Sequence, residues 1–207
     1  GASYIIQPKL DGVRCIAIVK HGGGVELYTR NGTKISGYDD IESALDTPIF
    51  YGRMFDGEIM GSDFDNTMEG LFALGRRKEA VYTVFDGMTL EQFNSRQCNI
   101  PYEQRLAKVE EIINDTIDPC IEPIVSKKFT RLELLDGELD ETNEFYVELG
   151  YEGTVVKDAG SPYNFKRSYS WVKFKKMITE EFDCVDFVEG DGRFLGTLGA
   201  IVVSTKN

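Results

Sequence analysis

Lys9 is followed by Asp11, Gly12 and Arg14 in a short segment that could support covalent chemistry. On an extended chain Lys9 and Asp11 point to the same face, and Gly12 permits a tight turn that brings the cation of Arg14 back towards them. A lysine becomes a nucleophile when its amine is neutral, and neighbouring cations and partial burial both lower its pKa. The segment therefore predicts a nucleophilic lysine, although Lys-x-Asp-Gly alone is more typical of an exposed strand end.

Two further segments carry a carboxylate beside a glycine and an apolar run. One is Phe55-Asp56-Gly57-Glu58, and the other runs from Glu152 to Lys157. Mg²⁺ prefers a few carboxylates completed by water and substrate phosphate. We therefore expect Glu58 and Glu152 to share a divalent cation, although either glutamate alone is more typical of a surface acid at a turn.

A basic strip lies between residues 166 and 177 and contains no acidic residue. Within it, Trp171-Val172-Lys173-Phe174-Lys175 predicts a strand with Lys173 and Lys175 on one face and Val172 and Phe174 on the other. A fixed pair of cations can hold a phosphate or lower the pKa of a third lysine. We expect the lysines to face a substrate and the apolar pair to face the core; an exposed strand with a basic edge is the alternative.

Strands and helices of ordinary length must position these side chains. Apolar and β-branched runs predict strands at 4–7, 13–19, 25–29, 55–60, 81–85, 154–156 and 170–174. Apolar residues at helical spacing predict a helix over 102–116, and a short helix is expected over 39–45. Thr130-x-x-Glu133 is typical of a capping box that begins another helix, which Gly150 would end. The order favours an α+β fold with largely antiparallel sheet.

The composition is that of an ordinary globular chain. The 207 residues are 42% hydrophobic and 28% charged, with a formal net charge of −12. No apolar run is long enough for a membrane span and no export leader opens the chain, so we expect a cytoplasmic protein with no membrane partner. The acidic balance argues mildly against a nucleic-acid partner, because phosphate binding needs cations, but the basic strip still offers a local phosphate-binding surface.

Taken together and in this order, the segments resemble the motifs of the covalent nucleotidyltransferase superfamily, which comprises DNA ligases, RNA ligases and mRNA-capping guanylyltransferases. Five motifs are similar to residues 9–14, 55–58, 82–87, 152–157 and 171–175. Residues 29–32, 85–87 and 171–175 resemble the versions found in ATP-dependent DNA ligases of the short bacteriophage type. The resemblance implies an α+β nucleotidyltransferase fold, ATP-grasp-like, with mostly antiparallel sheets flanked by helices.

The resemblance also implies how ATP is held. Lys9 is the catalytic nucleophile that attacks the α-phosphate of ATP and forms lysyl-AMP. Phe85 stacks on adenine, and Gln7 recognises the adenine amino group. The full set of implied nucleotide-binding residues is Gln7, Lys9, Arg14, Arg30, Glu58, Phe85, Lys173 and Lys175.

Metal and DNA contacts follow from the same resemblance. Glu152 and Glu58 would hold Mg²⁺ or another divalent cation. Contacts to the phosphates of nicked double-stranded DNA are assigned to Arg14, Arg30, Lys166 and Arg167. AMP then passes to the 5′-phosphate of the nick, and the 3′-hydroxyl displaces AMP and seals the strand. An RNA ligase or an mRNA-capping guanylyltransferase that uses the same lysyl-nucleotide chemistry is the alternative.

The resemblance divides the chain into a nucleotidyltransferase (adenylation) domain at 1–178 and an incomplete oligonucleotide-binding (OB) domain at 179–207. Strands expected near 182–188 and 199–204 are similar to the start of an OB-type β-barrel. A sixth motif, normally late in that barrel, is not present in the sequence. We therefore expect slow or undetectable self-adenylation from ATP and poor nick sealing. The chain is also expected to be a monomer. A noncatalytic binding domain is a further alternative, but it would be expected to lack Lys9 or Glu152, and both are present.

Overall fold

The computed structural model describes residues 2–61, 80–175 and 181–204. The chain forms two compact units, residues 1–175 and 176–207, and each is described by itself. The domain boundary expected at residue 178, and Lys176 of the basic strip, lie outside the described residues. Within the described ranges, no helix combines the length and the apolar character needed to cross a membrane.

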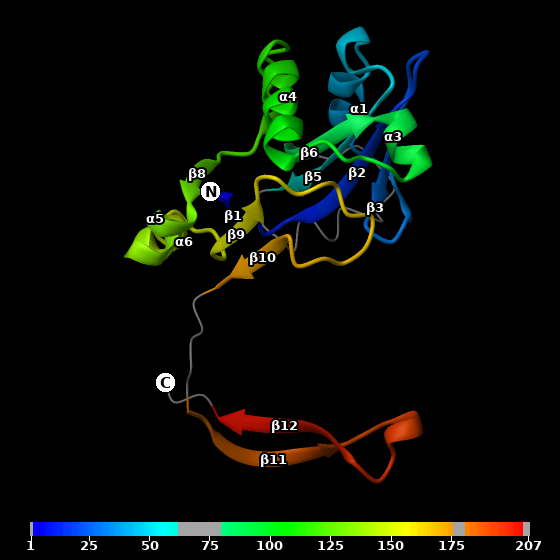
Figure 1. Cartoon of the computed structure of the whole chain (residues 1–207). Helices are drawn as coiled ribbons and strands as arrows, with labels where there is room; N and C mark the ends of the chain where they lie inside the picture. The colour runs from blue at the N-terminus through cyan, green and yellow to red at the C-terminus, as the bar shows by residue number, and fades with distance from the viewer. Residues whose placement is uncertain (1, 62–79, 176–180, 205–207) are drawn as a thin grey trace. The chain divides into compact units, whose positions relative to one another are not determined.

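A six-stranded sheet forms the larger part of the first unit (Figure 1). Its order is β4-β3-β2-β5-β6-β7, antiparallel throughout except for the parallel pair β6 and β7. The strands are β2 (Val13–Val19), β3 (Val25–Thr29), β4 (Lys34–Ile35), β5 (Arg53–Met60), β6 (Val81–Thr89) and β7 (Ile121–Pro123). Along β2, buried and half-buried residues alternate, which is the pattern of a strand whose two faces differ in burial.

Two helices cover one face of this sheet (Figure 1). They are α1 (Asp39–Leu45) and α4 (Tyr102–Asn114), and the 3₁₀ turn η1 (Pro48–Phe50) follows α1. Their apolar residues pack with those of β2, β5 and β6 into the main core. Both expected helices are confirmed; α4 begins at the expected residue and ends two residues earlier, at Asn114.

A second sheet has four antiparallel strands in the order β10-β9-β1-β8. The strands are β1 (Ser3–Pro8), β8 (Lys127–Thr130), β9 (Thr154–Asp158) and β10 (Trp171–Phe174). Between β8 and β9 the chain forms α5 (Arg131–Glu133), the π-helical η2 (Leu134–Glu138) and α6 (Leu139–Glu148). Thr130 and Glu133 form the predicted reciprocal capping box, and Gly150 adopts φ +92° just after α6, so the start and stop signals are confirmed.

An apolar cluster joins the two sheets. It contains Ile5 of β1, Phe85 of β6, Tyr102 of α4 and the partly buried Trp171 of β10. A separate cluster lies under α3 (Leu90–Ser95) and includes Met54 and Met88. The first cluster places residues of β1, β6 and β10 side by side although they are far apart in the sequence.

The second unit is a β-hairpin of β11 (Asp183–Glu189) and β12 (Leu198–Ser204), with the 3₁₀ turn η3 (Gly192–Phe194) in its loop. Both strands expected here are confirmed to within one residue at each end. A two-stranded hairpin does not define a barrel, so it leaves the OB-type expectation as a prediction.

Among the described residues of the first unit, the elements that escaped prediction are the short β4 and η1, and β7, β8 and α3. Strands β7 and β8 have only three and four residues, and β8 is largely exposed, so neither carries an apolar alternation. Helix α3 did carry a signal, because Thr89 and Gln92 form a reciprocal capping box at its start.

Candidate active site

Lys9 lies just after β1 and beside the residues that precede β9. The antiparallel pairing of β1 with β9 continues past Pro8, because the Lys9 N–H donates to the Gly153 carbonyl at 2.7 Å and the Glu152 N–H donates to the Lys9 carbonyl at 3.3 Å. Gly153 has φ +137°, and a Cβ there would lie 2.4 Å from the Phe174 carbonyl oxygen, so only glycine fits. Three of the predicted motifs are thus joined through the backbone.

The Lys9 ammonium is ion-paired with Glu152 Oε2, and the same oxygen lies 2.8 Å from Lys175 Nζ. The Lys9 side chain is only 13% exposed. Burial lowers the pKa of Lys9, the positive charges of Lys175 and Lys173 lower it further, and Glu58 opposes them. The direct contact with Glu152 favours the ammonium form. The site therefore combines a half-buried amine, two flanking cations and one carboxylate, which is the environment expected for a nucleophilic lysine.

Glu58 approaches the same region from β5 of the large sheet. Its Oε1 accepts a hydrogen bond from the Gly12 N–H at 3.3 Å. Burial raises the pKa of Glu58, whereas this hydrogen bond and the charge of Lys9 lower it. A Cβ on Gly12 would lie 2.4 Å from the Ile59 carbonyl oxygen, so the close approach needs glycine. Asp11, which the sequence placed on the face of Lys9, is exposed.

Phe85 occupies a β-bulge in β6. Asp56 pairs with Asp86 and Gly57 pairs with Val84, so no β5 residue lies opposite Phe85. A bulge redirects a side chain. Here the buried ring joins the cluster between the sheets and meets Trp171 edge-to-face, with ring centroids 5.7 Å apart. The fold therefore presents Phe85 at the place where the two sheets meet.

Arg14 is held at the edge of this cluster by a bidentate ion pair with Asp56. Its Nε and Nη2 donate to Asp56 Oδ1 and Oδ2 at 2.9 and 2.6 Å, and the Tyr163 hydroxyl also donates to Oδ2 at 2.8 Å. The guanidinium carbon lies 5.9 Å from the ring centroids of Phe85 and Trp171. Because 32% of the side chain stays exposed, Arg14 is a fixed cation that a bound molecule can reach.

Gln7 and Lys157 are buried on one face of the small sheet, since Lys157 pairs with Ile5 two residues before Gln7. Both donate to the hydroxyl oxygen of Tyr102, from Gln7 Nε2 at 2.8 Å and from Lys157 Nζ at 3.0 Å. Lys157 Nζ also lies 3.7 Å from the Trp171 ring centroid, and burial lowers the pKa of Lys157 to about 7. Sequence reasoning assigned no role to Lys157 or Tyr102, although the fourth motif ends at Lys157.

The expectation that Val172 and Phe174 of β10 face the core is wrong. Val172 is 52% exposed and Phe174 is only partly buried, so this pair is not part of the core. Instead Trp171 packs against the cluster between the sheets. Trp171 alternates with Val172 and therefore shares the face of Lys173, and this is the face that turns towards Lys9.

Three of the predicted cations lie apart from these contacts. Arg30 is exposed in the turn after β3, and Lys166 and Arg167 are exposed in the segment before β10. No hydrogen bond or ion pair joins any of them to another residue of the described ranges. Their assignment to DNA phosphates stays a prediction.

Glu58 and Glu152 reach Lys9 from different sheets, which bears on the expected metal. Within residues 2–61, 80–175 and 181–204, no three His, Cys, Asp or Glu side chains are grouped to hold a metal ion. A Mg²⁺ ion does not need such a group, because it is usually held by one or two carboxylates together with water and phosphate. Glu152 already attracts two ammonium groups to one oxygen, and Glu58 is a second carboxylate in the same region, so the residues present fit a divalent cation of this kind.

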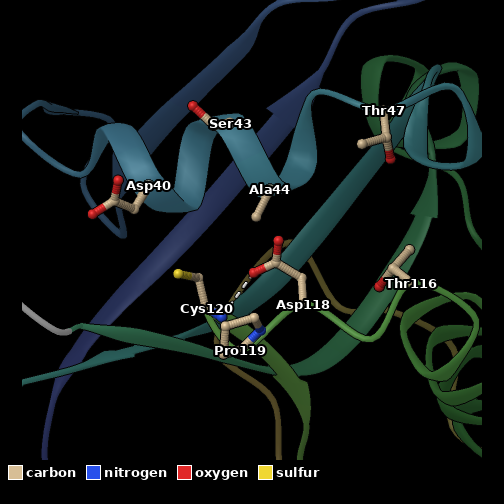
Figure 2. A pocket seen from close by; sticks show the side chains of 8 residues that line it. All are labelled: Asp40, Ser43, Ala44, Thr47, Thr116, Asp118, Pro119 and Cys120. Carbon is tan, nitrogen blue, oxygen red and sulfur yellow. Dashed lines mark hydrogen bonds between the residues drawn. The ribbon is translucent and has the colours of Figure 1, made fainter.

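A shallow, open pocket of about 360 Å³ lies elsewhere, between α1 and the segment 116–120 (Figure 2). Figure 2 shows Ala44 of α1 pointing towards Asp118, whose Oδ1 accepts from the Cys120 N–H at 2.8 Å, whereas the Ser43 side chain points away. None of the residues that line this pocket is a predicted site residue. The candidate active site is therefore identified by its chemistry rather than by this hollow.

A half-buried lysine among cations and carboxylates, next to an aromatic cluster between two largely antiparallel sheets, is typical of a nucleotidyltransferase. Residues 1–175 match the protein family described as "ATP dependent DNA ligase domain". The chain therefore belongs to the ATP-dependent DNA ligase domain family, as the motifs predicted. This match does not favour the alternatives of an RNA ligase or a capping guanylyltransferase.

Similar proteins agree with the family. The chain is 27% identical over 214 residues to the multifunctional non-homologous end joining protein LigD of Pseudomonas aeruginosa, covering 95% of this chain and 24% of LigD. It is 28% identical over 206 residues to a DNA ligase of African swine fever virus, covering 94% of this chain and 47% of that ligase. The solved structure named Pmar-Lig_Pre is 29% identical with a TM-score of 0.90, covering all of this chain and 50% of that one. The chain thus spans half or less of these relatives.

Proposed function

We propose that this chain performs the nucleotidyl-transfer chemistry of an ATP-dependent DNA ligase, with Lys9 as the nucleophile. The observation that carries the proposal is the arrangement around Lys9. A lysine of lowered pKa is paired with Glu152, which also contacts Lys175, inside a domain that matches the ligase family. A lysine held only for stability would not need two further cations beside it.

In the first step, the neutral Lys9 amine attacks the α-phosphorus of ATP. A nitrogen–phosphorus bond forms, the bond to the bridging oxygen breaks, and pyrophosphate leaves with that electron pair. The proton lost from the Lys9 nitrogen passes to solvent. Lys173 and Lys175 lower the pKa of Lys9 and would also neutralise charge that builds up on the α-phosphate.

The remaining contacts to the nucleotide come from both sheets. Phe85, presented by the bulge, would stack on adenine, because an aromatic ring can stack on any base. Gln7 would meet the adenine amino group, and Arg14 and Glu58 would meet the ribose and the phosphates. The exposed Arg30 is also assigned to the nucleotide.

Glu152 and Glu58 would hold Mg²⁺. When bound, the ion would offset the charge of the phosphates and of the developing pyrophosphate. The Glu152 carboxylate would then favour the Lys9 ammonium less strongly, and the charges of Lys175 and Lys173 would have the larger effect on the pKa of Lys9.

In the later steps, a 5′-phosphate oxygen of a DNA nick attacks the AMP phosphorus, and the bond to Lys9 breaks. The 3′-hydroxyl then attacks the activated 5′-phosphate, releases AMP and seals the strand. Contacts to the DNA phosphates are assigned to Arg14, Arg30, Lys166 and Arg167. With so few cations on a chain of charge −12, DNA binding should be weak and should fall steeply with salt.

The proposal includes a cytoplasmic monomer and a nucleotidyltransferase domain at 1–178. Residues 179–207 would be the first strands of an OB-type barrel. The hairpin of β11 and β12 supports this reading by its antiparallel pairing. The relative in African swine fever virus, a protein named DNA ligase, supports nicked DNA as the substrate.

The test is incubation of the chain with α-labelled ATP and Mg²⁺, followed by denaturing electrophoresis. We expect label that survives denaturation and is absent from Lys9→Ala and Lys9→Arg, because a guanidinium stays protonated and cannot attack. Lys108→Ala, which alters an exposed lysine of α4, should label like the parent. Stable label on either Lys9 variant would contradict the proposal, and label from GTP in place of ATP would favour a capping enzyme.

A further inference from the structure

Tyr102 is fully buried, and its hydroxyl is the meeting point of three hydrogen bonds in the cluster between the sheets. It donates to the Phe85 carbonyl at 2.8 Å and accepts from Gln7 Nε2 and Lys157 Nζ at 2.8 and 3.0 Å. A hydroxyl has one proton and two lone pairs. Every hydrogen-bonding position of this hydroxyl is therefore in use.

The bulge at Phe85 explains where the hydroxyl proton goes. Because Phe85 has no partner on β5, its carbonyl needs a donor from elsewhere. Tyr102 supplies that donor. The oxygen of Tyr102 is then left as an acceptor only, and it can receive N–H groups but cannot donate to Gln7.

This determines which way the Gln7 amide points. A glutamine amide presents an acceptor at one end and donors at the other. Tyr102 takes the NH₂ end, so the carbonyl end, Oε1, is left buried and without a hydrogen-bond partner among the described residues. The opposite orientation would place two acceptors against each other. A buried acceptor without a partner is costly and calls for an explanation.

We propose that Tyr102 is a positioning residue that sets the preference of the nucleotide pocket for adenine over 6-oxopurines, by fixing Gln7 with its carbonyl oxygen free. The inference rests on the proposed function. The 6-position of adenine carries an NH₂ donor, which complements a free carbonyl oxygen. Hypoxanthine and guanine carry a carbonyl oxygen there, which would face Gln7 Oε1 and repel it.

Tyr102→Phe isolates the hydroxyl, because it keeps the ring and removes only the oxygen. Without that oxygen Gln7 can turn over and offer its NH₂ group to a 6-carbonyl. We expect the ratio of kcat/KM for ATP over inosine triphosphate, measured as label on Lys9, to fall about tenfold or more. A role in stability alone would lower labelling from both nucleotides alike and leave the ratio unchanged.

Two comparisons separate this effect from a general loss of a buried hydroxyl. Tyr146 on α6 is also buried, and its hydroxyl has no hydrogen-bond partner within the described part of the chain, so it forms no hydrogen bond with Gln7. Tyr146→Phe should keep the parent ratio. In a Gln7→Leu background, Tyr102→Phe should no longer change the ratio, because Tyr102 acts through Gln7.

Equilibrium binding of AMP and IMP, measured by calorimetry, gives a readout that does not depend on catalysis. We expect the parent to prefer AMP and Tyr102→Phe to lose most of that preference. If ATP labels Lys9 and the purine preference is the same in Tyr102→Phe, the inference is wrong and the proposed function stands. If AMP is preferred through Tyr102 but Lys9 is never labelled, the proposed function is wrong and the inference stands. Equal binding of AMP and IMP by the parent would overturn the inference.

Discussion

Replacing Arg105 by methionine would remove one half of a buried ion pair that ties α4 to β6. Arg105 Nε and Nη2 donate to Asp86 Oδ1 and Oδ2 at 2.8 and 2.9 Å, and the two side chains are 1% and 0% exposed. Nη1 of Arg105 also donates to the carbonyls of Ile100 and Ser161. The substitution therefore leaves a buried carboxylate and two carbonyls without these donors.

The expected loss of stability follows from this geometry. Removing one partner of a buried ion pair costs about 3–5 kcal/mol, because the remaining charge is left uncompensated in a poorly solvated site. For a chain of this size, 1 kcal/mol corresponds to a shift of roughly 2–4 °C in Tm. Arg105→Met should therefore lower the Tm by about 6–20 °C.

Urea unfolding followed by circular dichroism measures the change in the free energy of unfolding. Lys108→Ala is the matched control on the same helix, because Lys108 pairs with Glu111 at the surface, where such a pair contributes at most about 1 kcal/mol. Arg105→Met combined with Asp86→Asn should lose less stability than Arg105→Met alone, since position 86 then carries no uncompensated charge. A loss below about 1 kcal/mol for Arg105→Met would refute the reasoning.

Three other results are expected. Lys173→Ala should reduce labelling of Lys9 by ATP while changing the free energy of unfolding by no more than about 0.5 kcal/mol. Val172→Ala, at an exposed position of the same strand, should change the free energy of unfolding equally little. A large loss of stability in either variant, measured by urea unfolding, would contradict the exposure of these two side chains. Gly153→Ala should lower the free energy of unfolding by about 1–3 kcal/mol or more, because φ +137° and the Phe174 carbonyl both exclude a Cβ. Gly150→Ala should lower it less, because Gly150 has φ +92° but open space around it. Equal losses in the two variants would count against the steric argument. Burial lowers the pKa of Lys157 to about 7 from an unfolded value of 10.5. Between these pH values the unfolded chain binds more protons than the folded chain. Lys157 therefore makes the free energy of unfolding rise with pH, by at most about 1.4 kcal/mol per pH unit. The stability of the parent relative to Lys157→Met should therefore increase from pH 7 to pH 9, and a difference that stays constant would show that Lys157 titrates normally.

Much of the secondary structure was predictable because its signals are local. Val13–Val19, Val25–Thr29 and Asp39–Leu45 have the predicted bounds, since alternation and helical spacing are properties of neighbouring residues. The capping box at Thr130 is likewise defined by four consecutive residues. By contrast, β7 and β8 pair through their backbones with little apolar pattern, so only the neighbouring strands decide that they are strands.

Residue types at short spacing also identified Lys9, Glu152, Lys173 and Lys175 as candidates for one site, and the resemblance to ligase motifs was confirmed by the family match. The tertiary structure alone decided which groups touch. It brought Glu152 to Lys9 by the pairing of β1 with β9, and it exposed Val172 because Trp171 takes the inner face of β10.

The orientation of Gln7 depends most completely on the fold. It requires a bulge in β6 that frees the Phe85 carbonyl and a helix that delivers Tyr102 to it, 95 residues further along the chain than Gln7. A sequence pattern records which groups can form hydrogen bonds. Which partner each group has, and which atom is left over for a ligand, is decided only when distant segments pack together and every buried donor and acceptor competes for the same few neighbours.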